Sequence, residues 1–119
     1  MHLKLVMPYI DRMIQSGSIF KWCKTEGESV NYGEELLHVK VVHQDHHTMM
    51  GLICITSSDM GIIRRIYAQE GAHHRVGDLL AVLSTDENES IDGTDLMLTQ
   101  ASAFRVVVNF VEPNTVGQW

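Results

Sequence analysis

The chain has 119 residues and a formal net charge of −6, with 45% hydrophobic residues, seven histidines and two cysteines. This length allows one domain with a modest core, and the acidic balance disfavours a nucleic-acid partner. No apolar run has the length of a signal peptide or of a membrane span, which needs roughly 20 residues, so the sequence predicts a cytoplasmic protein with no membrane partner and with free, structural thiols.

Strand-like patterning runs through residues 3–83, where short apolar stretches alternate with Gly, Asn, Asp and Ser. In the longest of these stretches, His38 and Lys40 project to one face and the apolar residues around them to the other. The pattern favours an all-β fold, because no stretch before residue 95 shows a convincing helical period. The candidate strands are 18–22, 36–42, 62–67 and 79–83.

Two stretches, 17–36 and 61–80, are similar at a constant offset of 44 residues. Each reads Gly, an apolar strand, Glu-Gly, a short polar stretch, Gly, an acidic residue and Leu. A unit this short cannot bury its apolar face alone, so we expect the two copies to pack on each other about an approximate two-fold axis. The residues expected in their shared core include Ile19, Val39, Ile63 and Leu83.

The chain beyond the repeat changes in composition. Residues 86–95 are polar and acidic, as in a loop or linker, whereas 104–111 are rich in β-branched and aromatic residues, as in a strand. We expect this strand to be covered, either as an edge strand of the same domain or by pairing with a second copy in a homo-oligomer. The sequence thus predicts a domain at 1–85, a linker at 86–95 and a C-terminal extension at 96–119.

A set of residues follows a characteristic order and spacing: Met7, Pro8, Gly17, Ile19, Trp22, Glu26, Gly27, Val30, Gly33, Glu34, Leu36 and Val39, then Gly61, Glu70, Gly71, Val76, Gly77, Asp78, Leu80, Ala81 and Val82. This pattern covers about residues 5–84 and resembles the lipoyl/biotinyl carrier domain, especially that of 2-oxo acid dehydrogenase acyltransferases. The resemblance implies a flattened barrel, or sandwich, of two four-stranded antiparallel sheets with internal pseudo-two-fold symmetry. It also implies a lysine at the hairpin tip between the two copies, where an enzyme attaches lipoate or biotin.

The hairpin between the copies departs from that family pattern. Counting ten residues on from Gly33 reaches His43 in place of the lysine, whereas counting eleven back from Gly61 reaches Met50, so the hairpin carries about seven extra residues. A histidine ring cannot form the stable amide that attachment of lipoate or biotin requires. The nearest lysine is Lys40, three residues before His43 and within an expected strand.

We therefore predict a non-catalytic lipoyl/biotinyl-like domain, without lipoate or biotin, that contacts a component of a 2-oxo acid dehydrogenase or carboxylase system. One alternative is an acyl carrier modified at Lys40. Another is a domain that binds a divalent transition metal, because borderline metals favour imidazole nitrogen and carboxylate oxygen; its candidate ligands are His43, Asp45, His46 and His47. No phosphate loop, catalytic triad or carboxylate pair is recognisable, and Cys54 is expected as a buried thiol on a strand.

Overall fold

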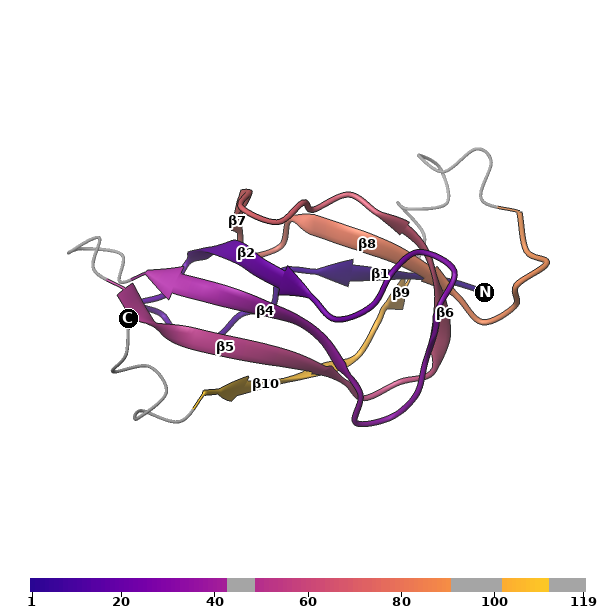
Figure 1. The fold of residues 1–119 in the computed structure, drawn as a ribbon, viewed down its shortest axis with the longest axis horizontal. Coiled ribbons are helices and arrows are strands. Elements are labelled where there is room, and N and C mark those ends of the chain that lie inside the picture. The colour runs from indigo at the N-terminus through magenta and orange to yellow at the C-terminus, as the bar shows by residue number, and fades with distance from the viewer. Residues whose placement is uncertain (43–48, 91–101, 112–119) are drawn as a thin grey trace.

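The described residues of this computed structural model are 1–42, 49–90 and 102–111, and they form two five-stranded sheets (Figure 1). The strands are β1 (His2–Val6), β2 (Ser16–Trp22), β3 (Ser29–Val30), β4 (Glu35–Val42), β5 (Met49–Ser57), β6 (Gly61–Ile66), β7 (His73–Arg75), β8 (Leu79–Ser84), β9 (Ser102–Ala103) and β10 (Val106–Phe110). One sheet has the order β3-β6-β8-β1-β9 and the other β10-β5-β4-β2-β7. The predicted all-β fold is confirmed, since no residue in these ranges is helical, and none of them forms a helix that could cross a membrane.

The two sheets are related by the internal symmetry that the repeat predicts. Exchanging β2 with β6, β3 with β7, β4 with β8 and β5 with β1 converts the order β7-β2-β4-β5 into β3-β6-β8-β1. The register agrees as well: Ile19 pairs with Val39, Ile63 pairs with Leu83, and a β-bulge follows each pair. All four side chains are buried, at most 1% exposed, in one shared core as predicted.

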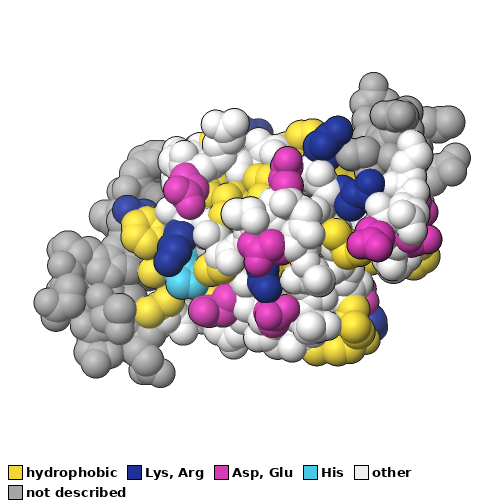
Figure 2. Space-filling model, turned by 45° about the vertical axis from the view of Figure 1, so that its right-hand side comes forward, with side chains coloured by type: hydrophobic (Ala, Val, Ile, Leu, Met, Phe, Trp, Pro, Cys, Tyr) yellow, Lys and Arg dark blue, Asp and Glu magenta, His cyan; other side chains and the backbone are white. Residues whose placement is uncertain are grey.

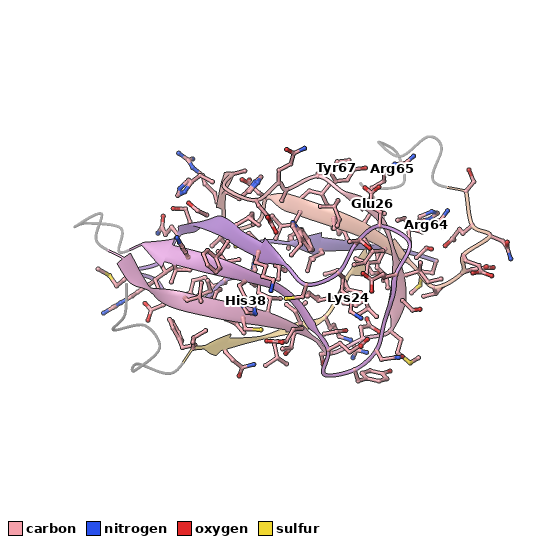
Figure 3. The ribbon with its side chains drawn as sticks, in the orientation of Figure 1. Lys24, Glu26, His38, Arg64, Arg65 and Tyr67 are labelled. Atoms are coloured by element: carbon pink, nitrogen blue, oxygen red, sulfur yellow. The ribbon has the colours of Figure 1, made fainter. Side chains whose placement is uncertain are left out.

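The repeated Glu-Gly pairs connect the two copies. A carboxylate oxygen of Glu26, which is labelled in Figure 3, accepts a hydrogen bond from the backbone N–H of Ile66 at 2.8 Å. Glu70 accepts the equivalent bond from the backbone N–H of Trp22 at 2.9 Å. The glycine after each glutamate has a positive φ, 95° at Gly27 and 90° in the second copy, and donates its N–H to a strand of the other copy. Each pair therefore forms a turn in its own copy and binds the backbone of the other.

Each sheet has five strands instead of the expected four, because the C-terminal segment adds one strand to each. β9 pairs in parallel with β1 and β10 pairs antiparallel with β5, so this segment occupies the two edges that the internal symmetry makes equivalent (Figure 1). Phe104, which lies in the chain between β9 and β10, is only 4% exposed. Its ring packs close to Gly61, since a Cβ atom at that glycine would lie 3.5 Å from the ring. The segment thus binds both sheets around one buried ring, while the exact ends of the predicted domain and linker stay a prediction.

Candidate functional site

The connection between β4 and β5 is where the family resemblance predicts a modified lysine. On its two sides, Val41 pairs with Gly51 and Val42 with Met49, at the end of the molecule far from the N-terminus (Figure 1). Nine residues therefore separate Val41 from Gly51 in the chain. The candidate metal ligands of this connection lie outside the described residues, so a metal site there stays a prediction; they are His43, Asp45, His46 and His47.

All lysines of the chain lie in the described residues and outside that connection: Lys4 in β1, Lys21 in β2, Lys24 just after β2, and Lys40 in β4. Lys40 is the nearest to the hairpin. It pairs with Ser18 on one side and Leu52 on the other, so its backbone belongs to the interior of the sheet. Its ammonium group lies 4.6 Å from the centre of the Phe20 ring, within cation–π distance.

A second group of polar side chains lies on β4 and β5, on the face turned away from the core. The Cys54 thiol donates a hydrogen bond to Glu35 Oε1 at 3.1 Å, and His38 Nε2 lies 3.3 Å from the same oxygen. One ligand atom of each residue lies within 4.8 Å of the other two. We call this group the Glu35–His38–Cys54 cluster; its His38, labelled in Figure 3, is the direct cross-strand neighbour of Cys54.

The environment of the cluster keeps the thiol protonated. Burial, then the hydrogen bond to Glu35 and the negative charge of that carboxylate, raise the pKa of Cys54 to about 12. Conversely, the hydrogen bond from Cys54 and then the contact with His38 lower the pKa of Glu35. At neutral pH a thiol beside a carboxylate is a poor nucleophile. Cys54 is thus a buried thiol on a strand, as the sequence predicts, and not an activated thiolate.

The sequence pattern did not bring these three residues together. The residue pattern places His38 on the polar face of a strand and predicts Cys54 as a buried thiol on a strand, and it gives Glu35 no role. Residues 35 and 38 are three positions apart, which places them on opposite faces of a regular strand. No signal in the chain alone marks the backbone irregularity that joins them.

Two symmetry-related β-sheets packed around one core define a barrel-sandwich domain. The chain belongs to the biotin/lipoyl family, because the family model described as "Biotin-requiring enzyme" matches residues 4–83. This confirms the resemblance that the residue spacing indicated. The match covers both copies of the repeat and ends just before the acidic segment.

Proteins similar to this chain include components of pyruvate dehydrogenase complexes. The chain is 29% identical over 82 residues to the pyruvate dehydrogenase protein X component, mitochondrial, of Mus musculus, covering 68% of this chain and 15% of that protein. It is 31% identical over 101 residues to the dihydrolipoyllysine-residue acetyltransferase component of the pyruvate dehydrogenase complex of Rickettsia typhi, covering 84% and 23%. It is 28% identical over 89 residues to acetyltransferase component 2, mitochondrial, of Arabidopsis thaliana, covering 74% and 15%. The chain thus spans less than a quarter of the length of these relatives.

Proposed function

We propose that this chain is a non-catalytic lipoyl/biotinyl-type domain that carries neither lipoate nor biotin and acts by contacting another protein of a 2-oxo acid dehydrogenase assembly. The observation that supports this most is the placement of the lysines. The chain belongs to a carrier family, yet it has no lysine between Val41 and Gly51, where the modified residue is expected. Attachment of either cofactor needs a primary amine, and no histidine, methionine, glutamine or threonine of that connection supplies one.

The surroundings of Lys40 support the absence of a cofactor on that residue as well. Its backbone is paired on both sides within the sheet, and its side chain packs over Phe20. A ligase that recognises a lysine on a tight turn would have to pull this residue out of β4. That step breaks ladder hydrogen bonds on both sides, each with a net contribution of about 0.5–1.5 kcal/mol.

The proposed partner comes from the relatives and from the surface. The relatives are named as components of pyruvate dehydrogenase complexes, so we propose a component of such a complex rather than a carboxylase. On the face shown in Figure 2, acidic and basic side chains are scattered among hydrophobic and neutral ones, without a continuous basic patch. Together with the net charge of −6, this favours a protein partner over a nucleic acid.

Two further features stay predictions. A homo-oligomer formed through the C-terminal strand would have to use the outer edge of β10, because the other edge of that strand already pairs with β5. A cytoplasmic location is expected from the sequence, although two of the relatives above are named as mitochondrial proteins. Sedimentation of the purified chain and fluorescence microscopy of a tagged chain in its own host test them separately.

Intact-mass spectrometry after co-expression with a lipoate ligase or a biotin ligase tests the missing modification. We expect the mass of the unmodified chain, whereas an acetyltransferase lipoyl domain expressed with the same ligase gains its cofactor as a positive control. A cofactor mass that disappears in Lys40→Arg would overturn the proposal in favour of a carrier modified at Lys40. A cofactor mass that persists in that variant would overturn it too, and peptide mapping would identify the lysine used.

Isothermal titration calorimetry with the purified pyruvate dehydrogenase complex components of the same host tests the partner. We expect saturable binding to at least one component by the unmodified chain. Failure to bind any of them would overturn the proposed assembly while leaving the mass result untouched. The absence of a cofactor and the identity of the partner are therefore tested independently.

A further inference from the structure

The Glu35–His38–Cys54 cluster depends on a β-bulge in β4. In a regular strand, residues three positions apart point to opposite faces. In β4, however, the register with β5 shifts between Glu35 and Leu37, so Leu36 is an extra residue. Leu36 and Leu37 are both fully buried, and this turns Glu35 to the face that carries His38 and Cys54. The bulge therefore brings the carboxylate to the imidazole and the thiol.

The internal symmetry indicates that the fold does not require these three residue types. The same bulge occurs in the other sheet, where the register of β8 with β1 shifts between the pairs Val6–Leu79 and Leu5–Ala81. The positions there that correspond to the cluster are Leu79, Val82 and Lys4. An equivalent backbone is thus compatible with two apolar residues and a lysine, so the carboxylate, imidazole and thiol need another explanation.

We infer that the cluster is a binding site for a borderline divalent metal ion, zinc or cobalt, with Cys54 Sγ, His38 Nε2 and a carboxylate oxygen of Glu35 as ligands and a fourth position open to water. Tetrahedral zinc has metal–ligand distances of about 2.0–2.3 Å, which places its ligand atoms roughly 3.3–3.7 Å apart. The sulfur and the nitrogen already lie 3.1 and 3.3 Å from the shared oxygen. Since the sulfur and nitrogen are within 4.8 Å of each other, they need to approach by at most about 1.5 Å.

The chemistry of the three groups suits such an ion. The thiol loses its proton to solvent on binding, so a thiolate and a carboxylate balance the two positive charges while the imidazole stays neutral. A set of sulfur, nitrogen and oxygen ligands favours zinc or cobalt over magnesium or calcium. The nearest cation in the register is Lys21, opposite His38, and its exposed side chain is long enough to keep the ammonium in solvent. Pairing of β4 and β5 along their length holds the ligands in place.

Cobalt titration of the full chain, under reducing conditions and after removal of bound metal, tests the site, because a thiolate on cobalt produces a charge-transfer absorption band. We expect the band to saturate at one cobalt per chain and zinc to abolish it by displacement. Cys54→Ser should remove the band, and His38→Ala or Glu35→Gln should weaken binding by more than about 100-fold, the largest loss usual for partners that do not touch the metal. Cys23→Ser, which removes the other thiol of the chain, is the matched control and should keep both band and affinity.

A hairpin variant separates this site from the hairpin histidines. The band should persist when His43, His46 and His47 are all replaced by alanine, and its loss would place the metal at the hairpin instead. Absence of cobalt binding, binding without the band, or a band that survives Cys54→Ser but not Cys23→Ser would also overturn the inference. Circular dichroism checks the fold of each variant, and Cys54→Ala replaces the serine variant if that one unfolds. The titration uses chain whose intact mass shows no lipoate, because the two thiols of a reduced lipoyl group would bind cobalt as well.

Discussion

Replacing Gly17 by alanine should destabilise the protein more than the same change at Gly61, although the repeat makes the two positions equivalent. A Cβ atom at Gly17 would lie 2.6 Å from Val39 Cγ1 and 2.8 Å from the carbonyl oxygen of Lys40. That oxygen belongs to β4, which is paired on both sides and cannot move away without disturbing the sheet. At Gly61 the nearest atom, the carbonyl oxygen of Ser84, is 3.3 Å away, and a small shift relieves that contact.

The size of the difference follows from these distances. Overpacking costs about 1–3 kcal/mol, and we expect the upper end for Gly17→Ala; Gly61→Ala should cost less than about 1 kcal/mol, because the lower entropy of its unfolded chain offsets part of the strain. At roughly 4 °C per kcal/mol for a chain of this size, the thermal midpoint falls by about 10 °C in the first variant and by less than about 4 °C in the second. Urea unfolding followed by tryptophan fluorescence gives the free energies. Equal stability of the two variants would refute the close packing of β2 on β4.

Three other predictions concern a thiol, a buried ring and a carboxylate. Cys54, with its pKa raised to about 12 from 9.0, should react with iodoacetamide at pH 8 about 1000-fold more slowly than an unperturbed thiol, and mass spectrometry should show the rate rising about tenfold per pH unit up to pH 11. Phe104→Ala should cost about 3–5 kcal/mol in urea unfolding, against less than about 1 kcal/mol for Phe110→Ala, whose ring is 56% exposed; equal losses would contradict the anchoring role of the C-terminal segment. The hydrogen bond from the backbone N–H of Asn31, and then that from a lysine ammonium, lower the pKa of Glu34 from 4.5. The ionised Glu34 carboxylate therefore stabilises the protein at neutral pH, and this contribution is lost as the pH falls below about 4.5. In urea unfolding, Glu34→Gln should lose less stability than the unmutated chain between pH 6 and pH 3.

Much of the fold could be predicted because the repeat and the alternation of side chains indicate the same structure. Ile19 and Ile63 occupy equivalent places in the repeat, and both are buried. The structure explains why the Glu-Gly pair occurs in both copies, which the sequence alone does not. Glu26 and Glu70 each accept a hydrogen bond from the backbone of the other copy, so a change in one copy would leave an N–H of the other unpaired.

The predicted number of strands in each sheet was wrong, because the sequence pattern indicates neither where β10 pairs nor that β9 exists. β10 contains a run of β-branched residues, which predicts a strand, but that run does not indicate that the strand pairs with β5. β9 has only two residues, Ser102 and Ala103, and neither favours a strand. Its position follows from its neighbour Phe104, whose ring is buried and whose N–H donates to the carbonyl of Lys4. A short strand placed by the burial of an adjacent residue has no periodicity to detect.

The Glu35–His38–Cys54 cluster could not be predicted from the sequence, and the internal symmetry explains why. Positions that the fold requires, such as the paired glycines, stay alike in the two copies, so a position where the copies differ in chemistry is free for another role. The linear repeat, at its offset of 44, compares Glu35 with Leu79 and His38 with Val82. It offers no counterpart for Cys54, because the symmetry exchanges β5 with β1, which precedes the first copy in the chain, and this counterpart is Lys4. Only the three-dimensional symmetry compares all three positions at once, and it shows ligand-type residues at every one of them in one sheet and at none in the other.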